Sequence, residues 1–173
     1  MSFFGRCAIP IWLICYNKRM LKNERYTNLY KQAAELMNNR FGWLSNAANL
    51  SALIFQTLPD LNWVGFYLLD RNTLRLGPFQ GKVACTEIPI GKGVCGTAAA
   101  QQKTLAVADV HQFSGHIACD SASQSEIVIP ILVQGQVWGV LDIDAPIQNR
   151  FEETDRTELE KLVQLFIQKS FCK

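Results

Sequence analysis

The chain has 173 residues, of which 49% are hydrophobic and 18% are charged, so it can bury one core but is short for two domains. Its formal net charge of +2 is spread without a basic stripe, which argues against nucleic acid as a partner. Six cysteines in a chain of this length do not indicate a secreted disulfide framework, because the core alone can stabilise the fold. We therefore expect a reducing, cytoplasmic setting.

The first nineteen residues contain an apolar stretch after Arg6 that superficially resembles a secretion signal. Pro10 interrupts this stretch, no small-x-small cleavage site follows it, and it is too short to span a bilayer. We predict that residues 1–19 are an extension, that residues 20–173 form a single domain, and that the protein has no membrane partner. In this interpretation Cys7 and Cys15 carry no chemistry.

The apolar periodicity predicts helices and hairpins rather than alternating strand and helix units. Helices are expected at 26–40, after a Ser45 N-cap, at 94–102 and at 154–169, and strands at 62–69, 73–79, 87–90, 104–107, 126–133 and 137–144. The apolar face of the first helix is expected to comprise Leu29, Ala33, Leu36 and Met37. Because tight turns join only antiparallel strands, this order predicts an α+β fold, with an antiparallel β-sheet and helices packed mainly on one side.

The last hairpin has a pattern from which its register can be predicted. Odd-numbered residues are apolar in both of its strands, and the two apolar faces must coincide, since a slip of one residue would reverse one of them. A three-residue loop with Val133 opposite Val137 meets this condition and sets Glu126 opposite Asp144. A two-residue loop would pair Glu126 with Ile143, and Pro130 suggests an edge strand or a bulge that would shift the register.

This register gathers Glu126, Asp142 and Asp144 on one small patch of the sheet. Like charges directly opposite on a sheet destabilise it by up to about 1 kcal/mol, so we expect a bound cation, a metal or a shared proton to offset the repulsion. The simpler alternative is a solvated strand end whose carboxylates do not interact.

Cys85, Cys95 and Cys119 are expected in glycine-bearing or polar loops, where a cysteine is more suited to chemistry than to packing. Cys95 lies where an alanine-rich helix begins and Cys119 lies near His116; a helix N-terminus and a nearby cation both favour thiolate. The sequence thus predicts a thiol mechanism. A thiolate attacks an electrophile, a carboxylic acid with a raised pKa supplies a proton, and a second cysteine resolves the sulfenic acid as a disulfide.

Residues 91–96 match the G-x-G-x-x-G pattern of dinucleotide sites. However, Pro89 interrupts the preceding strand and the following helix is too short for a crossover, so glycines that permit a tight turn explain the pattern better.

Two metal sites were weighed from the same residue types. The available zinc ligands are Cys85, Cys95, Cys119, His111 and His116, but no C-x-x-C spacing is present. The carboxylates Glu126, Asp142 and Asp144 are an alternative site for a hard divalent cation, although such sites usually draw more oxygen ligands from a preformed loop. We therefore expect no metal and no bound cofactor.

Five sequence blocks, taken in order, resemble the free methionine-(R)-sulfoxide reductases, which are built on the GAF fold. The blocks are residues 77–85, 91–98, 115–120, 125–128 and 139–144, and the resemblance covers roughly residues 26–166. It implies a GAF-like catalytic domain that reduces free L-methionine-(R)-sulfoxide in the cytoplasm under oxidative stress. It further implies a homodimer with thioredoxin as the external reductant.

The resemblance also implies roles for the cysteines. Cys119 matches the attacking cysteine and Cys85 the usual resolving cysteine, while Cys95 matches a third cysteine whose part as a further disulfide partner is less settled.

The remaining implied site residues surround the substrate. Glu126, Asp142 and Asp144 match the acidic residues that hold the ammonium and assist the sulfoxide oxygen, and Trp63 and Tyr67 match aromatic residues near the methyl group. Backbone amides around Ile117 and Ala118 are expected to receive the substrate carboxylate as an anion nest. The alternatives are a non-catalytic GAF module that senses a small ligand, and a redox sensor whose disulfide changes a partner interaction.

Overall fold

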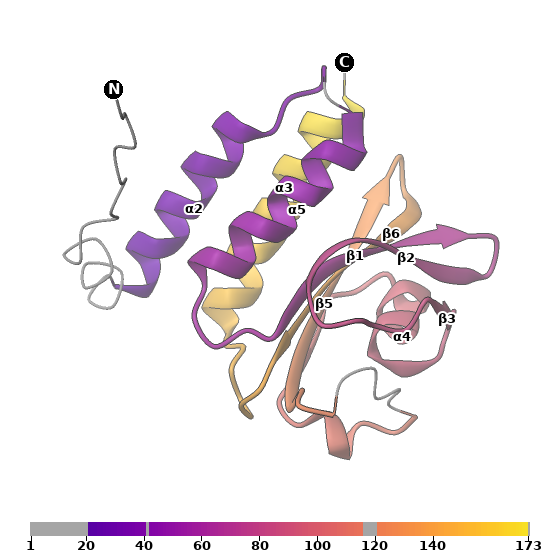
Figure 1. Cartoon of the computed structure of the whole chain (residues 1–173). Helices are drawn as coiled ribbons and strands as arrows, with labels where there is room; N and C mark the ends of the chain where they lie inside the picture. Colours follow the sequence, from indigo (N-terminus) through magenta and orange to yellow (C-terminus); the bar gives the residue numbers. More distant parts are fainter. Residues whose placement is uncertain (1–20, 41, 116–120, 173) are drawn as a thin grey trace, which may run out of the picture.

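The structure is a computed structural model that describes residues 21–40, 42–115 and 121–172 (Figure 1). The extension predicted for residues 1–19 lies outside the described residues, and the domain boundary stays a prediction. Within the described segments, no helix has both the length and the apolar composition that a membrane crossing requires.

A six-stranded antiparallel sheet forms the centre of the fold, in the order β3-β2-β1-β6-β5-β4. Its strands are β1 (Trp63–Asp70), β2 (Thr73–Gly81), β3 (Glu87–Pro89), β4 (Leu105–Val107), β5 (Ser125–Val133) and β6 (Gln136–Ala145). A short 3-10 helix, η1 (Val110–Gln112), follows β4. The two hairpins predicted from the sequence, β1-β2 and β5-β6, are confirmed.

Helices cover the two faces of the sheet unequally. The helices α2 (Lys22–Leu36), α3 (Gly42–Thr57) and α5 (Glu153–Phe171) run side by side over one face, while α4 (Gly93–Gln101) lies against the other (Figure 1). Each face has its own buried apolar cluster, with Phe66, Leu141 and Phe166 under the three helices and Tyr67, Val128 and Val140 under α4. The predicted α+β class, with helices mainly on one side, is confirmed.

Two details of the helices differ from the prediction. Helix α3 begins at Gly42, whose φ of 74° favours glycine, so Ser45 lies inside the helix and does not cap it. Helix α2 ends at Leu36, which is exposed, while Met37 remains buried as the C-terminal cap. The chain becomes extended at Met37, so the helical spacing does not determine which residues face the core from that residue onward.

The β5-β6 register confirms one part of the prediction and corrects the other. Glu126 lies opposite Asp144, as predicted, but the loop has two residues and Val133 lies opposite Gln136 rather than Val137. A bulge at Trp138, between the pairs Ile131–Gly139 and Leu132–Val137, restores the alignment of the apolar faces.

The physical reason for the shorter loop lies in its two turn residues. Gln134 and Gly135 both adopt positive φ, 53° and 76°, which is the backbone of the tight hairpin turn that matches strand twist. The bulge also places two side chains on the faces opposite to those predicted. Trp138 packs with Phe166 under the helices, and Val137 joins the apolar cluster under α4.

Pro130 does not mark an edge strand, because β5 lies between β6 and β4. Strand β4 pairs only with Glu126, Ile127 and Val128, so Pro130 lies beyond its end. The missing amide donor therefore breaks no bond to β4.

Asp155 is a fully buried carboxylate that fastens α2 to the start of α5. It accepts hydrogen bonds from Tyr26 Oη at 2.7 Å, Lys22 Nζ at 2.5 Å and Arg150 Nη1 at 3.2 Å, and from the Glu152 amide at 2.9 Å. Burial alone would raise its pKa, but the hydrogen bonds from Lys22 and the other donors outweigh burial and hold the pKa below 3.8.

We predict that Asp155→Asn lowers the free energy of unfolding by about 3 kcal/mol, because it removes the buried charge that two partly buried cations, Lys22 and Arg150, face. The control Glu153→Gln, at an 81% exposed side chain on the same helix, should change it by less than about 0.5 kcal/mol. Since the folded-state pKa of Asp155 is lowered, its contribution is present above pH 3.8 and disappears as the pH falls through that pKa. Urea unfolding at several pH values measures this; equal stabilities of wild type and Asp155→Asn at pH 7 would contradict it.

Candidate functional site

The candidate site lies on the face of the sheet covered by α4, where β1, β6 and β5 run side by side. Trp63 of β1 pairs with Asp144 of β6, which pairs with Glu126 of β5. In the next row that shares this face, Gly65 pairs with Asp142. Because residues directly opposite share a face, the antiparallel pairing collects the acidic residues beside an aromatic residue.

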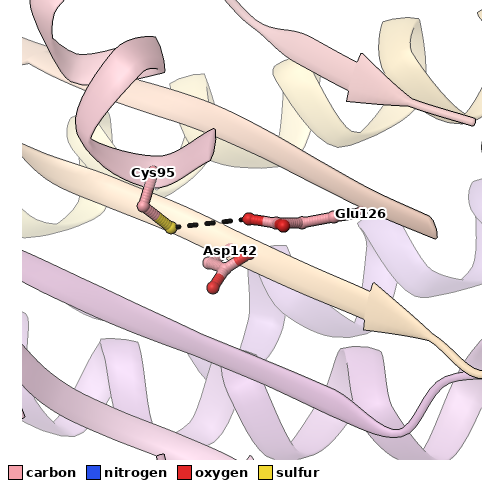
Figure 2. Close-up of side chains that lie close together, drawn as sticks. All are labelled: Cys95, Glu126 and Asp142. Carbon is pink, nitrogen blue, oxygen red and sulfur yellow. Dashed lines mark hydrogen bonds between the residues drawn. The ribbon is translucent and has the colours of Figure 1, made fainter. Parts of the chain in front are cut away.

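Helix α4 adds a thiol to the acidic residues. The side chains of Cys95, Glu126 and Asp142 converge (Figure 2), and one donor atom from each lies within 4.8 Å of the other two. The Cys95 thiol donates a hydrogen bond to Glu126 Oε1 with an Sγ–Oε1 distance of 3.7 Å. Cys95 is 3% exposed, and Glu126 and Asp142 are each 6% exposed.

Burial sets the electrostatics of the two carboxylates. The pKa of Glu126 is raised well above 4.5, first by burial and then by the charges of Asp142 and Asp144. The pKa of Asp142 is also raised by burial, while contacts from Cys95 and Glu126 oppose the rise. Both pKa values are therefore raised, so the pair holds a proton more readily than exposed carboxylates do. The alternative of a solvated strand end is wrong for these two residues, although Asp144 is only half-buried.

The expectation that Cys95 favours thiolate is wrong. Burial raises the pKa of its thiol well above 9.0, and the charges of Asp142 and Glu126 raise it further. Cys95 does lie in the first turn of α4, but a helix N-terminus is too weak to offset an apolar environment and two acidic neighbours.

Trp63 and Tyr67 form an aromatic wall beside the acidic residues. The Trp63 ring stacks on Phe79 at a centroid distance of 5.4 Å and on Tyr67 at 5.7 Å. The indole lies across Gly65, where an added Cβ would come within 2.4 Å of Trp63 Cη2. Sequence reasoning missed Gly65 and Phe79; a glycine inside an aromatic strand was the available signal, because it marks a close approach.

The same two aromatic residues hold the segment that carries Cys85. Trp63 Nε1 donates to the Lys82 carbonyl at 3.1 Å, and Tyr67 Oη donates to the Cys85 carbonyl at 3.0 Å. Cys85 is half-buried and is bonded in a disulfide. Cys95 and Cys172 are free thiols.

Several residues predicted for the site are not brought into it or cannot be assessed. Cys119, Ile117, Ala118 and His116 lie outside the described residues, so their roles stay predictions. His111 is exposed on η1 and does not join the cluster of Cys95, Glu126 and Asp142, which is the only group of possible metal ligands in the described segments. The all-antiparallel sheet agrees with the rejection of a dinucleotide site at residues 91–96.

Comparison with known proteins agrees with this fold and gives the family. The GAF domain family matches residues 32–168. The free methionine-R-sulfoxide reductase of Escherichia coli is 51% identical over 144 residues, covering 83% of this chain and 87% of that protein. The structure of fRMsr of Staphylococcus aureus in complex with substrate is similar with a TM-score of 0.80 and 53% identity, covering 83% of this chain and 94% of that one. The free methionine-R-sulfoxide reductase from Neisseria meningitidis in complex with its substrate gives a TM-score of 0.82 and 38% identity, covering 87% and 92% of the two chains.

The chain is therefore a GAF domain protein. Within that fold it belongs to the free methionine-R-sulfoxide reductase family of oxidoreductases, which confirms the family predicted from the sequence.

We predict that Cys95 in the folded protein reacts with iodoacetamide at pH 8 at least about tenfold more slowly than the exposed Cys172, because a buried thiol of raised pKa has little thiolate. Peptide mass spectrometry after timed alkylation measures both residues in one sample. In urea the two rates should become similar. Equal rates in the folded protein would contradict the burial of Cys95.

Proposed function

We propose that the protein reduces free L-methionine-(R)-sulfoxide to L-methionine by thiol chemistry. The observation that carries the proposal is the pair of buried carboxylates, Glu126 and Asp142, beside an aromatic wall in a chain of this family. An amino acid brings the ammonium group that such acidic residues can bind, and its methyl-bearing sulfur suits an indole surface. The relative in Escherichia coli is a free methionine-R-sulfoxide reductase, and the Staphylococcus aureus and Neisseria meningitidis structures are complexes with substrate.

In the proposed reaction, the thiolate of Cys119 attacks the sulfoxide sulfur and the sulfoxide oxygen is protonated. The S–O bond of the substrate breaks as the oxygen passes to Cys119, so methionine leaves and a cysteine sulfenic acid remains. The thiol of Cys85 then attacks the sulfenic acid, which releases water and forms a disulfide. Thioredoxin, as external reductant, supplies two electrons and two protons to restore both thiols.

The electrostatics support different tasks for the two buried carboxylates. In this proposal Glu126 carries the proton, because the charges of Asp142 and Asp144 add to burial in raising its pKa, and it donates that proton to the sulfoxide oxygen. Asp142, whose pKa rise is opposed by contacts from Cys95 and Glu126, pairs with the substrate ammonium, and the half-buried Asp144 adds negative charge. Preference for the free amino acid follows, because a methionine residue within a peptide carries neither the ammonium nor the carboxylate.

The proposal extends to the setting of the enzyme. We expect it to act in the cytoplasm as a homodimer, with Cys95 as a buried residue of the site rather than an obligatory disulfide partner. The raised pKa and low exposure of the Cys95 thiol support this view of Cys95.

The assignment predicts methionine formation from the R diastereomer of free methionine sulfoxide, with dithiothreitol as reductant, and little from the S diastereomer or from N-acetylmethionine sulfoxide amide. Chromatography of the released amino acid measures this. Absence of methionine from the R form would overturn the proposed function, and a non-catalytic ligand or redox sensor would then be favoured.

Two cysteine variants serve as controls for the mechanism. Cys119→Ser should abolish even a single turnover. Cys85→Ser should form one methionine per chain and then stop with thioredoxin as reductant; full steady-state turnover of Cys85→Ser would show that another cysteine resolves the sulfenic acid.

Glu126→Gln and Asp142→Asn should affect different kinetic constants. Glu126→Gln removes a proton donor and should lower kcat by about 100-fold or more. Asp142→Asn removes a charged hydrogen-bond acceptor and should raise KM by about 10-fold or more with a smaller effect on kcat. Because Asp142 must be ionised to hold an ammonium, KM in the wild type should rise as the pH falls through a pKa of about 6, and this rise should be absent in Asp142→Asn. An effect of Asp142→Asn on kcat alone, with KM unchanged, would contradict the role of Asp142 in binding the ammonium.

A further inference from the structure

The cluster of Cys95, Glu126 and Asp142 has more ligand capacity than an ammonium group uses. An ammonium donates hydrogen bonds and is well served by carboxylates, whereas a thiol sulfur is a weak acceptor. Cys95 nevertheless lies within the cluster, 3.7 Å from Glu126 Oε1, and is 3% exposed. A thiolate contributes much more to binding a metal ion than to binding an ammonium.

The donor atoms are preformed and held by regular structure. Cys95 comes from the first turn of α4, Glu126 from the start of β5 and Asp142 from β6, and the three side chains point toward one another (Figure 2). Their donor atoms lie within 4.8 Å of one another. In a tetrahedral zinc site, Zn–S and Zn–O bonds of about 2.3 and 2.0 Å separate sulfur and oxygen by about 3.5 Å. The observed Sγ–Oε1 distance of 3.7 Å is close to that value.

A second observation concerns Asp142. Its Oδ1 is buried and has no hydrogen-bond partner among the described residues, although the side chain is only 6% exposed. No ion pair between Asp142 and a lysine or arginine is found in the described part of the chain. Buried carboxylate oxygens are normally partnered, so this oxygen points to a positively charged ligand.

The identity of the donors selects among metal ions. Mg²⁺ and Ca²⁺ take oxygen ligands almost entirely, and soft ions such as Cu⁺ prefer several sulfur ligands. Zn²⁺ binds cysteine sulfur and carboxylate oxygen together, and three protein ligands leave a fourth position open.

We propose that Cys95, Glu126 and Asp142 bind one Zn²⁺ ion, and that the bound ion excludes the amino acid substrate from the same carboxylates. The exclusion rests on the proposed function; the binding of zinc does not. On binding, Cys95 and Glu126 release their protons to solvent and each donor gives an electron pair to the ion, with no change of oxidation state. Zinc would thus inhibit the reductase reversibly. The expectation of no metal treated the cysteine and histidine residues and the carboxylates as separate candidate sites, because the sequence does not reveal that Cys95 lies beside these carboxylates.

The test titrates the reduced, metal-free full chain with zinc chloride in competition with a chromophoric chelator. We expect one Zn²⁺ per chain, with affinity lowered by about 100-fold or more in Cys95→Ser and in Asp142→Asn. Cys172→Ser, at a free and exposed thiol, should bind zinc as the wild type does. Cys85→Ser should also retain binding, which distinguishes this site from one built on the other reactive cysteines.

A second measurement detects the thiolate ligand in the wild type itself. Co²⁺ added to the wild type in place of zinc should produce a thiolate-to-cobalt charge-transfer absorption, and Cys95→Ser, checked for folding by circular dichroism, should lack it. Absence of stoichiometric zinc binding in the wild type, or binding that survives both Cys95→Ser and Asp142→Asn, would overturn the site.

Competition between zinc and substrate distinguishes failure of the zinc site from failure of the proposed reductase function. Free methionine-(R)-sulfoxide should weaken the apparent zinc affinity of Cys119→Ser, which cannot turn the substrate over. Zinc binding that is unaffected by substrate would overturn the exclusion and leave the metal site standing. Loss of the predicted reductase activity alongside intact zinc binding would overturn only the proposed function.

Discussion

Two carboxylates buried side by side under α4 are the constraint on which the site depends. Glu126 and Asp142 cannot both ionise easily in apolar surroundings, because each loses hydration and each opposes the charge of the other. The pair therefore holds a proton at a pH where exposed carboxylates have none. Such a pair provides both a proton donor and an acceptor for a positive group, which are two of the functions that thiol-dependent reduction of an amino acid sulfoxide requires.

A comparison within the same chain shows that burial alone does not decide the outcome. Asp155 is more deeply buried than Glu126, yet its pKa is lowered, because Lys22, Tyr26 and Arg150 donate to it. Asp155, surrounded by hydrogen-bond donors, stabilises the helical layer. Glu126 and Asp142, which have acidic neighbours, are suited to bind a positively charged ligand. The buried carboxylate in the layer of three helices thus contributes to stability, whereas the buried carboxylates on the α4 face form the candidate site.

Much of the fold follows from the sequence, because a two-residue side-chain period and tight turns restrict an antiparallel hairpin severely. The same period set Glu126 opposite Asp144 correctly. Pro130 suggested an edge strand or a bulge, but the position of the bulge at Trp138 was not predictable, since it depends on a turn in which Gln134 adopts positive φ. The burial of Cys95 was missed for a different reason. Its environment is created by packing of α4 across β5 and β6, which are distant in sequence, whereas a local pattern shows only the start of a helix.

Carbon-13 NMR titration of the side-chain carboxyls of Glu126 and Asp142, assigned with Glu126→Gln and Asp142→Asn, tests directly whether the buried pair holds a proton. We expect Asp142 to lose its proton first and Glu126 to remain protonated well above the range of an exposed glutamate. Titration of both groups as independent carboxylates near pH about 4, the ordinary value for exposed side chains, would contradict it.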